Sequence, residues 1–169
     1  GDFKYEDANG DGKIDDADRV FVGSYQPKIY GGLNLSATYK NFDISTDLYG
    51  AVGGKIYNGK KAFRQSLLDN VEKSMAYDRW VRGANIQDEP AANGGYLPAS
   101  TYFIESGDFI RINNISVGYT FDKAILEKVK AASARFFVTA QNFFTFKKYS
   151  GFTPELSSGT PTRSGIELN

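Results

Sequence analysis

Apolar and polar residues alternate along two neighbouring stretches of the chain, residues 29–39 and 42–52. Successive side chains of a β-strand point to opposite faces of its sheet, so the alternation predicts two strands with one apolar and one polar face. Only Lys40 and Asn41 separate the two stretches, which predicts an antiparallel hairpin with a tight turn. The residues predicted on the apolar face are Leu33, Leu35, Ala37, Tyr39, Phe42, Ile44 and Leu48, and those on the polar face are Asn34, Ser36, Thr38, Asp43, Ser45, Asp47 and Tyr49.

Two later stretches, residues 108–121 and 135–146, alternate in the same way and predict a second pair of strands. The connector between them, residues 122–134, has a helix-prone composition. The expected apolar set of the third strand is Ile115, Val117, Tyr119 and Phe121, opposite Asn114, Ser116, Gly118 and Thr120. In the fourth strand Phe136, Val138 and Ala140 oppose Phe137, Thr139 and Gln141.

A long segment, residues 53–107, separates the two pairs of strands and shows no alternation, so we expect no strand in it. Part of it has apolar residues at helical spacing, which predicts one short amphipathic helix over residues 60–76. These residues are Phe63, Leu67, Leu68, Val71 and Met75. A segment of this length without strands is uncommon in a compact domain and is typically a functional loop. Residues 147–165 have the Gly, Pro and Ser content of a further loop.

The predicted fold class is all-β, with antiparallel strands of a transmembrane β-barrel, long extracellular loops and one short loop helix. A soluble sandwich would alternate as well, but three features favour the barrel. The polar face carries many small uncharged residues, aromatic residues gather near strand ends, and short and long connections alternate along the chain. Each strand has about 9 to 13 residues, which is enough to cross a bilayer at a tilt.

Residues 7–18, DANGDGKIDDAD, have the spacing of a calcium loop, although no pair of long helices flanks them. Oxygen-bearing side chains fall at the positions that bind calcium, and Lys13 falls where only a backbone carbonyl is needed. The predicted Ca²⁺ ligands are Asp7, Asn9, Asp11, Lys13, Asp15 and Asp18. An Asp-, Asn- and Gly-rich surface turn without metal is the alternative. If calcium binds, it staples a loop that leads into the first strand.

The composition narrows the possible functions. Lys plus Arg equals Asp plus Glu at 20 each, so the net charge gives no indication of a nucleic-acid partner. The absence of His and Cys removes the commonest general base and any thiol chemistry. Asp43 and Asp47 share a strand face but lie roughly 13 Å apart, which is too far for a glycosidase pair. We therefore expect no enzymatic activity.

The order of several motifs is similar to that in the C-terminal barrel region of SusC/RagA-type TonB-linked outer-membrane transporters. The motifs are FKYEDANGDGKIDDADRVFVGSYQPKIYGGLNLSATYKNFDIS, YGAVGGKIYNG, DRWVR, STYFIESGDFIRINNISVGYTF and ARFFVTAQNFFTFKKYSGFTPEL. The resemblance extends over almost all of residues 1–169.

The resemblance implies the outer membrane of a Gram-negative bacterium and import of glycans or peptides. Such a transporter has a barrel of about 22 strands closed by a plug, a SusD-like lipoprotein lid and energy supplied through the TonB complex. The resemblance also implies that residues 1–28, 53–107 and 147–165 lie outside the cell and that Lys40–Asn41 and residues 122–134 lie in the periplasm. The barrel wall contacts outer-membrane lipid and the rest of the same barrel.

The chain shows no plug domain and no closing strand, so we expect it to be a segment of a transporter that cannot transport alone. Trp80, the only tryptophan, lies in the long loop and could contact a solute or the lid, although packing of the loop is the commoner role. The alternative function is a soluble, secreted, calcium-stabilised β module that binds carbohydrate or protein.

Overall fold

The computed structural model describes residues 3–63, 71, 73–83, 89–91, 99–128 and 130–155. The chain forms two compact units, which we describe separately. The sheet unit comprises Tyr25–Gly54 and Ser106–Tyr149, and the loop unit comprises Gly1–Ser24, Lys55–Glu105 and Ser150–Asn169. The elements in chain order are η1 (Asp16–Asp18), β1 (Ile29–Tyr39), β2 (Phe42–Val52), β3 (Lys55–Tyr57), α1 (Gly59–Phe63), α2 (Lys73–Tyr77), η2 (Thr101–Phe103), β4 (Ile104–Ser106), β5 (Phe109–Thr120), α3 (Lys123–Lys128) and β6 (Arg135–Lys147).

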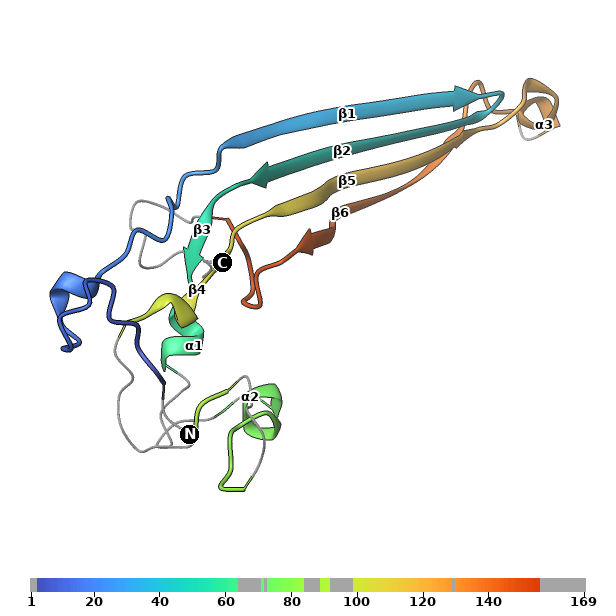
Figure 1. Ribbon diagram of the computed structural model, residues 1–169. Coiled ribbons are helices and arrows are strands. Elements are labelled where there is room, and N and C mark those ends of the chain that lie inside the picture. Colours follow the sequence, from blue (N-terminus) through green and yellow to red (C-terminus); the bar gives the residue numbers. More distant parts are fainter. Residues whose placement is uncertain are drawn as a thin grey trace. The chain divides into compact units, whose positions relative to one another are not determined.

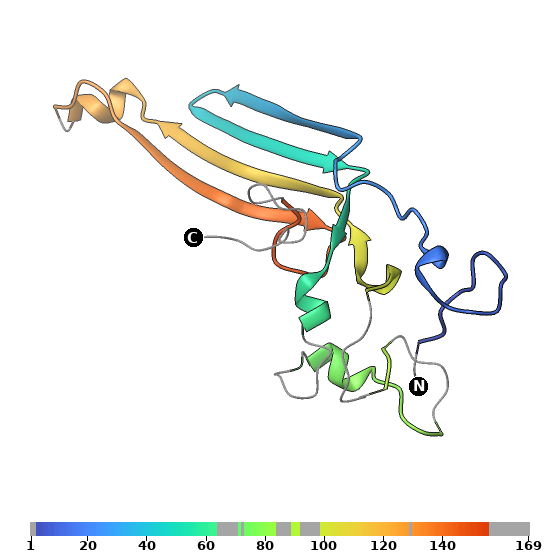
Figure 2. The ribbon, with the colours of Figure 1, turned by 90° about the vertical axis from the view of Figure 1, so that its left-hand side faces the viewer.

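The sheet unit is one antiparallel sheet with the strand order β1-β2-β5-β6 (Figure 1). The strands lie side by side in both views (Figure 2). The β1–β2 turn and the α3 connector meet at one end of the sheet, where the Asn41 side-chain amide donates to the Asp122 carboxylate at 2.6 Å. The Thr120 N–H also donates to the Asn41 carbonyl at 2.8 Å. All four predicted strands are confirmed.

The register of the strands gives the sheet one continuous apolar face. Tyr39, Phe42, Tyr119 and Phe136 are register partners across all four strands and form an aromatic row near the turn end. Phe144 and Phe146 stack at 4.7 Å nearer the other end. Between these aromatic groups, five aliphatic residues of the same face are 44–59% exposed: Leu33, Leu35, Ile44, Val117 and Val138. The sheet therefore presents an uncovered apolar band between aromatic residues.

Two β-bulges keep this face continuous. Asn113 of β5 has no partner in β2, since Asp47 pairs with Asn114 and Leu48 with Ile112. In β6, the two residues between Gln141 and Phe144 oppose Asn113 alone. A bulge shifts the alternation by one residue, so Ile112 and Ile115 face the same way in spite of their odd spacing.

The loop unit contains the two-stranded sheet β3-β4 and the short helices α1 and α2. Asn58 caps α1, because its side-chain oxygen accepts from the Lys61 N–H at 2.9 Å. The Asn58 N–H donates to the Phe103 carbonyl at 2.7 Å, and Phe103 is 1% exposed. Phe103 and the buried Ile56 form the apolar centre beside these elements.

Two expectations for the long segment are wrong. Residues 53–107 contain strands β3 and β4, which are too short for an alternating pattern to reveal. The helix predicted over 60–76 is not continuous, because Val71, a β-branched residue of modest helix propensity, lies outside α1 and α2 and is not helical. Residues 64–70 and 72 lie outside the described part of the chain. No helix among the described residues is long and apolar enough to cross a membrane.

Gly50 should be the most sensitive position of the sheet to an added methyl group. A Cβ there would lie 2.9 Å from the Phe109 carbonyl oxygen and 3.3 Å from the Ile110 side chain, and a backbone atom cannot move aside cheaply. We expect Gly50→Ala to lower the free energy of unfolding of the full-length barrel by about 1–3 kcal/mol, measured by denaturant titration in lipid vesicles.

Gly31, the register partner of Gly50, provides the matched control. A Cβ at Gly31 would meet nothing within 4 Å, so Gly31→Ala should leave the stability almost unchanged. Equal effects of the two substitutions would contradict the close approach of β2 and β5.

Candidate functional site

The polar face of the sheet unit is organised in rows that cross the strands. Ser36, Ser45, Ser116 and Thr139 are successive register partners and form a hydroxyl row. Within it, the Thr139 hydroxyl donates to the Ser116 hydroxyl at 3.0 Å. Asn34, Asp47, Asn114 and Gln141 form an adjacent amide row. In that row the Asn34 amide donates to the Asp47 carboxylate at 2.5 Å. Small hydrogen-bonding groups thus cover the middle of this face.

An ion pair crosses β5 on the same face. Arg135 Nη2 lies 2.5 Å from Asp43 Oδ2, and Arg135 Nε donates to Asp43 Oδ1 at 3.1 Å. Gly118 is the register partner of Asp43 on β5, and a Cβ there would come within 2.7 Å of both the Asp43 and the Arg135 side chains. Gly118 therefore leaves the space in which a two-point Arg–carboxylate contact spans three strands. This pair leaves its part of the face without net charge.

The end of the sheet opposite the β1–β2 turn is held by Asp108. Its carboxylate accepts from the Gly53 N–H at 2.7 Å and pairs with Lys148 Nζ at 3.2 Å. The Gly53 N–H lowers the pKa of Asp108 below its ordinary value, and this effect, with Ser106 and Lys148, outweighs the opposing effect of burial. Asp108 thereby joins the segments that follow β2 and β6 where they leave the sheet.

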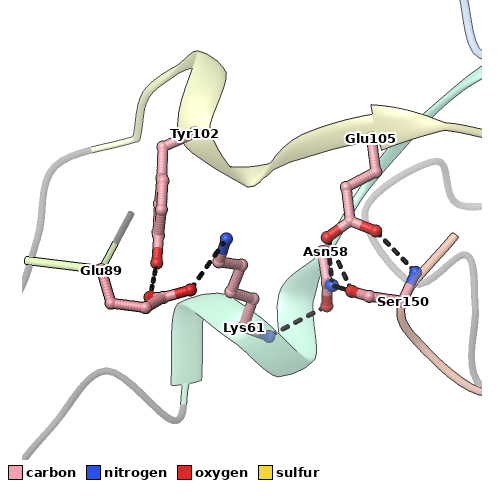
Figure 3. Close-up of polar contacts among 6 residues, drawn as sticks. All are labelled: Asn58, Lys61, Glu89, Tyr102, Glu105 and Ser150. Atoms are coloured by element: carbon pink, nitrogen blue, oxygen red, sulfur yellow. Dashed lines mark hydrogen bonds and ion pairs between the residues drawn. The ribbon is translucent and has the colours of Figure 1, made fainter. Parts of the chain in front are cut away.

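The loop unit contains a polar cluster centred on Glu105 (Figure 3). Glu105 Oε1 accepts from the Asn58 side-chain amide and from the Ser150 hydroxyl, both at 2.8 Å. Glu105 Oε2 accepts from the Ser150 N–H at 2.7 Å. The Asn58 amide also donates to the Ser150 hydroxyl at 2.9 Å, and Asn58 is 2% exposed. The cluster therefore ties the segment after β6 to two points of the long loop.

A second group of side chains lies beside this cluster (Figure 3). Lys61 Nζ is 3.6 Å from Glu89 Oε1 and 3.6 Å from the centroid of the Tyr102 ring. The Tyr102 hydroxyl donates to the other oxygen of Glu89. Ion pairing, cation–π attraction and a hydrogen bond thus fix the segment around Glu89 against α1 and η2.

The environment of Glu105 favours its ionised form. Partial burial would raise the pKa of the carboxyl group, but the Ser150 N–H, the Asn58 amide, the Ser150 hydroxyl and the charge of Lys61 together lower it below its ordinary value. Such a carboxylate stabilises the folded state above its ordinary pKa, and this contribution is lost as the pH falls through the lowered pKa.

In the calcium-type loop, the carboxylates contact backbone amides. Asp7 accepts from the N–H groups of Gly10 at 2.6 Å and Gly12 at 2.7 Å, and Asp18 accepts from that of Ala8 at 2.9 Å. Asp15 caps η1 through the Ala17 N–H at 2.8 Å. The remaining predicted ligands also lie in this loop: the Asn9 side-chain oxygen accepts from the Asp11 N–H at 2.9 Å, and Asp11 accepts from the Lys13 N–H at 2.8 Å.

The Asp15 N–H lowers the pKa of Asp18 most strongly, and hydrogen bonds from the Ala8 and Asn9 backbone and with the Asp7 side chain lower it further against the opposing effect of burial. The loop thus brings together Asp7 and Asp18, its first and twelfth residues. The predicted ligand atoms in the loop are all oxygens, which calcium prefers. Within the described residues, no group of three or more Asp, Glu, His or Cys side chains is arranged to hold a metal ion. Calcium binding stays a prediction.

Trp80 is half-buried, and its backbone N–H donates to the Glu89 backbone carbonyl at 3.0 Å. Its contact with a solute or a lid stays a prediction. The Glu105 cluster was not anticipated from the sequence, because Asn58 and Ser150 are 92 residues apart. The one local indication was Asn58 directly before the first helical residue, which is a common capping position.

Comparison with known proteins shows which class of protein this chain is similar to. TonB-dependent receptor P3 of Formosa agariphila is 30% identical over 151 residues, which cover 89% of this chain and 15% of that receptor. TonB-dependent receptor SusC of Bacteroides thetaiotaomicron is 31% identical over 161 residues, covering 92% of this chain and 15% of SusC. No family model matches the chain.

Solved structures give the same result for the fold. The RagAB peptide importer in its closed-closed state aligns with a TM-score of 0.66 at 22% identity, over 93% of this chain and 18% of the importer chain. A second structure, of the RagAB peptide transporter, aligns with a TM-score of 0.65 at 26% identity, over 78% of this chain and 15% of that chain.

The two-faced antiparallel sheet is thus part of a transmembrane β-barrel of the TonB-dependent transporter type. The chain belongs to the SusC/RagA-type TonB-dependent receptors, and it spans about 15% of the length of the curated relatives named here. These relatives are receptors and transporters rather than enzymes.

Acid should release the segment after β6 from the long loop. We expect the protection of the Ser150 N–H against hydrogen exchange, corrected for intrinsic rates, to be high at neutral pH and to fall once the pH drops below the ordinary range of a carboxyl group. Glu105→Gln should lower the protection about tenfold or more at neutral pH, because it removes a charge-assisted hydrogen bond.

Lys128→Gln provides a control, since it removes a charge at the end of α3 and leaves the contacts of Glu105 with Asn58 and Ser150 in place. Protection of Ser150 that is equal in Glu105→Gln and the unaltered receptor would contradict the role given to this carboxylate.

Proposed function

We propose that this chain supplies barrel wall and extracellular loops to an outer-membrane, TonB-dependent importer. The observation that carries the proposal is the division of the sheet into two unlike faces. One face is aliphatic between aromatic residues, whereas hydroxyl and amide groups cover the middle of the opposite face, with the Arg135–Asp43 pair beside them. A strand between lipid and an aqueous lumen needs this division.

The orientation follows from the connections. The short β1–β2 turn and the α3 connector lie at the periplasmic end, and residues 1–28, 53–107 and 147–165 lie outside the cell. Short periplasmic turns and long extracellular loops are the usual arrangement in bacterial barrels. Two of these long loops are joined through Glu105 and Ser150, which suits segments that contact a solute or a partner protein.

The proposed cargo is a glycan or a peptide, and the proposed partners are a SusD-like lipoprotein, the TonB complex, outer-membrane lipid and the rest of the barrel with its plug. Support comes from the similarity to SusC and to structures named as the RagAB peptide importer. A soluble, secreted module is disfavoured by the aliphatic face, because water would contact a row of half-exposed Leu, Ile and Val side chains.

Calcium is proposed to hold the loop of residues 7–18. The proposal rests on the spacing of the oxygen-bearing side chains, which matches that of a calcium loop. Asp7, Asp11, Asp15 and Asp18, with the Asn9 side chain and the Lys13 carbonyl, would supply oxygen ligands. The ion would order the loop and would take no part in chemistry.

The importer function can be tested in cells that produce the full-length receptor. Uptake of labelled glycan and peptide mixtures should require the receptor gene, return on complementation, and disappear when TonB is absent. A SusD-like lipoprotein should co-purify with the receptor from detergent extracts. Unchanged uptake of every labelled fraction after deletion of the gene would overturn the proposed function.

Calcium binding can be tested on the purified full-length receptor by equilibrium dialysis with labelled calcium. Asp7→Asn combined with Asp11→Asn should abolish binding by this loop and raise its proteolytic sensitivity, with no change in the strand content of the barrel. Asp16→Asn is the matched control, because Asp16 pairs with Arg19 at 2.8 Å and is not a predicted ligand. Calcium uptake that is the same in the double variant would exclude the site.

A further inference from the structure

The loop of residues 7–18 contains an asparagine followed directly by a glycine, at Asn9–Gly10. In such a pair the glycine backbone nitrogen can attack the asparagine side-chain carbon Cγ and form a five-membered imide. Glycine permits this attack most readily, because it has no Cβ to obstruct the approach. The chain has two further pairs, Asn58–Gly59 and Asn93–Gly94, of which the second lies outside the described residues. The surroundings of Asn9 and Asn58 can therefore be compared.

The hydrogen bonds around Asn9 engage each group that imide formation uses. The attacking group, the Gly10 N–H, donates to Asp7 Oδ1 at 2.6 Å, so a carboxylate is in place to accept its proton. Asn9 Oδ1 accepts from the Asp11 N–H at 2.9 Å, and this donor stabilises the negative charge that develops on the oxygen during the attack. The leaving nitrogen, Asn9 Nδ2, donates to Asp11 Oδ2 at 3.2 Å. A nucleophile, a base and an oxyanion donor thus lie within residues 7–11.

The backbone at Asn9 is also free of packing that would oppose ring closure. Asn9 and Gly10 are exposed, and both lie outside the helices and strands of the described chain. Gly10 has a φ of +77°, and a Cβ built on it would meet nothing within 4 Å. Segments with so few contacts change conformation at low cost. Water, which the second step of the reaction consumes, reaches both residues.

Asn58 has the opposite surroundings, although the same residue follows it. Its side chain is held on both sides, since its oxygen accepts from the Lys61 N–H and its amide donates to Glu105 and Ser150. Asn58 is 2% exposed, and Gly59 is the first residue of α1. Neither rotation of this backbone nor entry of water is easy there. The fold should therefore protect Asn58 and leave Asn9 reactive.

We infer that Asn9 is a site of spontaneous deamidation, in which the Asp7 carboxylate accepts the proton of the Gly10 N–H. A bond forms between the Gly10 nitrogen and Asn9 Cγ, the Cγ–Nδ2 bond breaks, and the proton passes to the departing nitrogen, which leaves as ammonia. Water then opens the imide at either carbonyl and gives aspartate or isoaspartate at position 9. Both products add a negative charge, and isoaspartate also places its Cβ in the main chain. The modification therefore changes the ligand spacing of the loop.

The test incubates the purified full-length receptor in mildly alkaline water enriched in heavy oxygen, with a chelator present so that no metal ion occupies the loop. Trypsin then releases residues 5–13 and 56–60, each with a single asparagine, and mass spectrometry measures the oxygen gained by each peptide. Enzymatic methylation detects isoaspartate. Relative to denatured receptor, Asn9 should convert at least as fast, whereas Asn58 should convert about tenfold more slowly or less.

Three variants test the assigned roles. Asp7→Asn keeps a hydrogen-bond acceptor but removes the base, and should slow conversion at Asn9 about tenfold or more. Asp16→Asn is the matched control, because Asp16 belongs to the same loop but pairs with Arg19, and the rate should stay unchanged. Asn9→Gln keeps an amide that cannot close a five-membered ring and should abolish the oxygen gain. Heat-modifiable electrophoretic mobility of each variant confirms that the barrel is folded.

Protection of Asn9 to the same degree as Asn58 would overturn the inference, and so would an unchanged rate in Asp7→Asn. An equal fall of the rate in Asp7→Asn and Asp16→Asn would assign the effect to the overall charge of the loop and would also overturn the role of Asp7.

Discussion

Backbone hydrogen bonding between β1, β2, β5 and β6 decides which surroundings each side chain meets. Because side chains alternate along a strand, a shift of one residue in any pairing would exchange the apolar and polar faces of that strand. The observed register aligns Tyr39, Phe42, Tyr119 and Phe136 on one face and the serine hydroxyls on the other. The aromatic row and the ion pair are both consequences of this one register. In a membrane the constraint is stricter, because an unpaired backbone group has no water to bind. The outer edges of β1 and β6 therefore require further strands of the barrel.

The four long strands could be predicted because each needs only information that is local in sequence. Alternation placed β1 and β2 at their observed ends, and the two residues between them left no room for anything except a tight turn. The bulges could not be predicted in this way. Asn113 adds one residue to β5 relative to β2, and β6 adds another relative to β5, with Asn142 in a left-handed conformation at φ +48°. Only the neighbouring strand shows that such a residue is extra, and without the Asn113 bulge Ile110 and Ile112 could not share the apolar face with Val117.

The loop unit was harder to predict for a related reason. Its order comes from contacts between residues that are far apart in sequence, such as Glu105 with Ser150 and Lys61 with Glu89. None of these residues belongs to a repeating pattern, and β3 and β4 have three residues each. Composition could therefore identify 53–107 as a long loop, but it could not show that a buried Asn58 and an ionised Glu105 organise it. The calcium-type spacing of residues 7–18 is a local signal, which is why it was visible from the sequence at all.

The two faces of the sheet impose different demands on the same backbone. The lipid-type face needs only apolar bulk, so Leu, Ile, Val and Phe alternate there with little specific contact. The polar face carries small hydrogen-bonding side chains in register and an Arg–Asp pair that requires Gly118. Large side chains return to this face at the loop end, where Tyr30 and Tyr49 flank Gly32. These rings are not needed for strand pairing, because backbone groups supply its hydrogen bonds, and Phe137 places a further ring on the same face near the turn end.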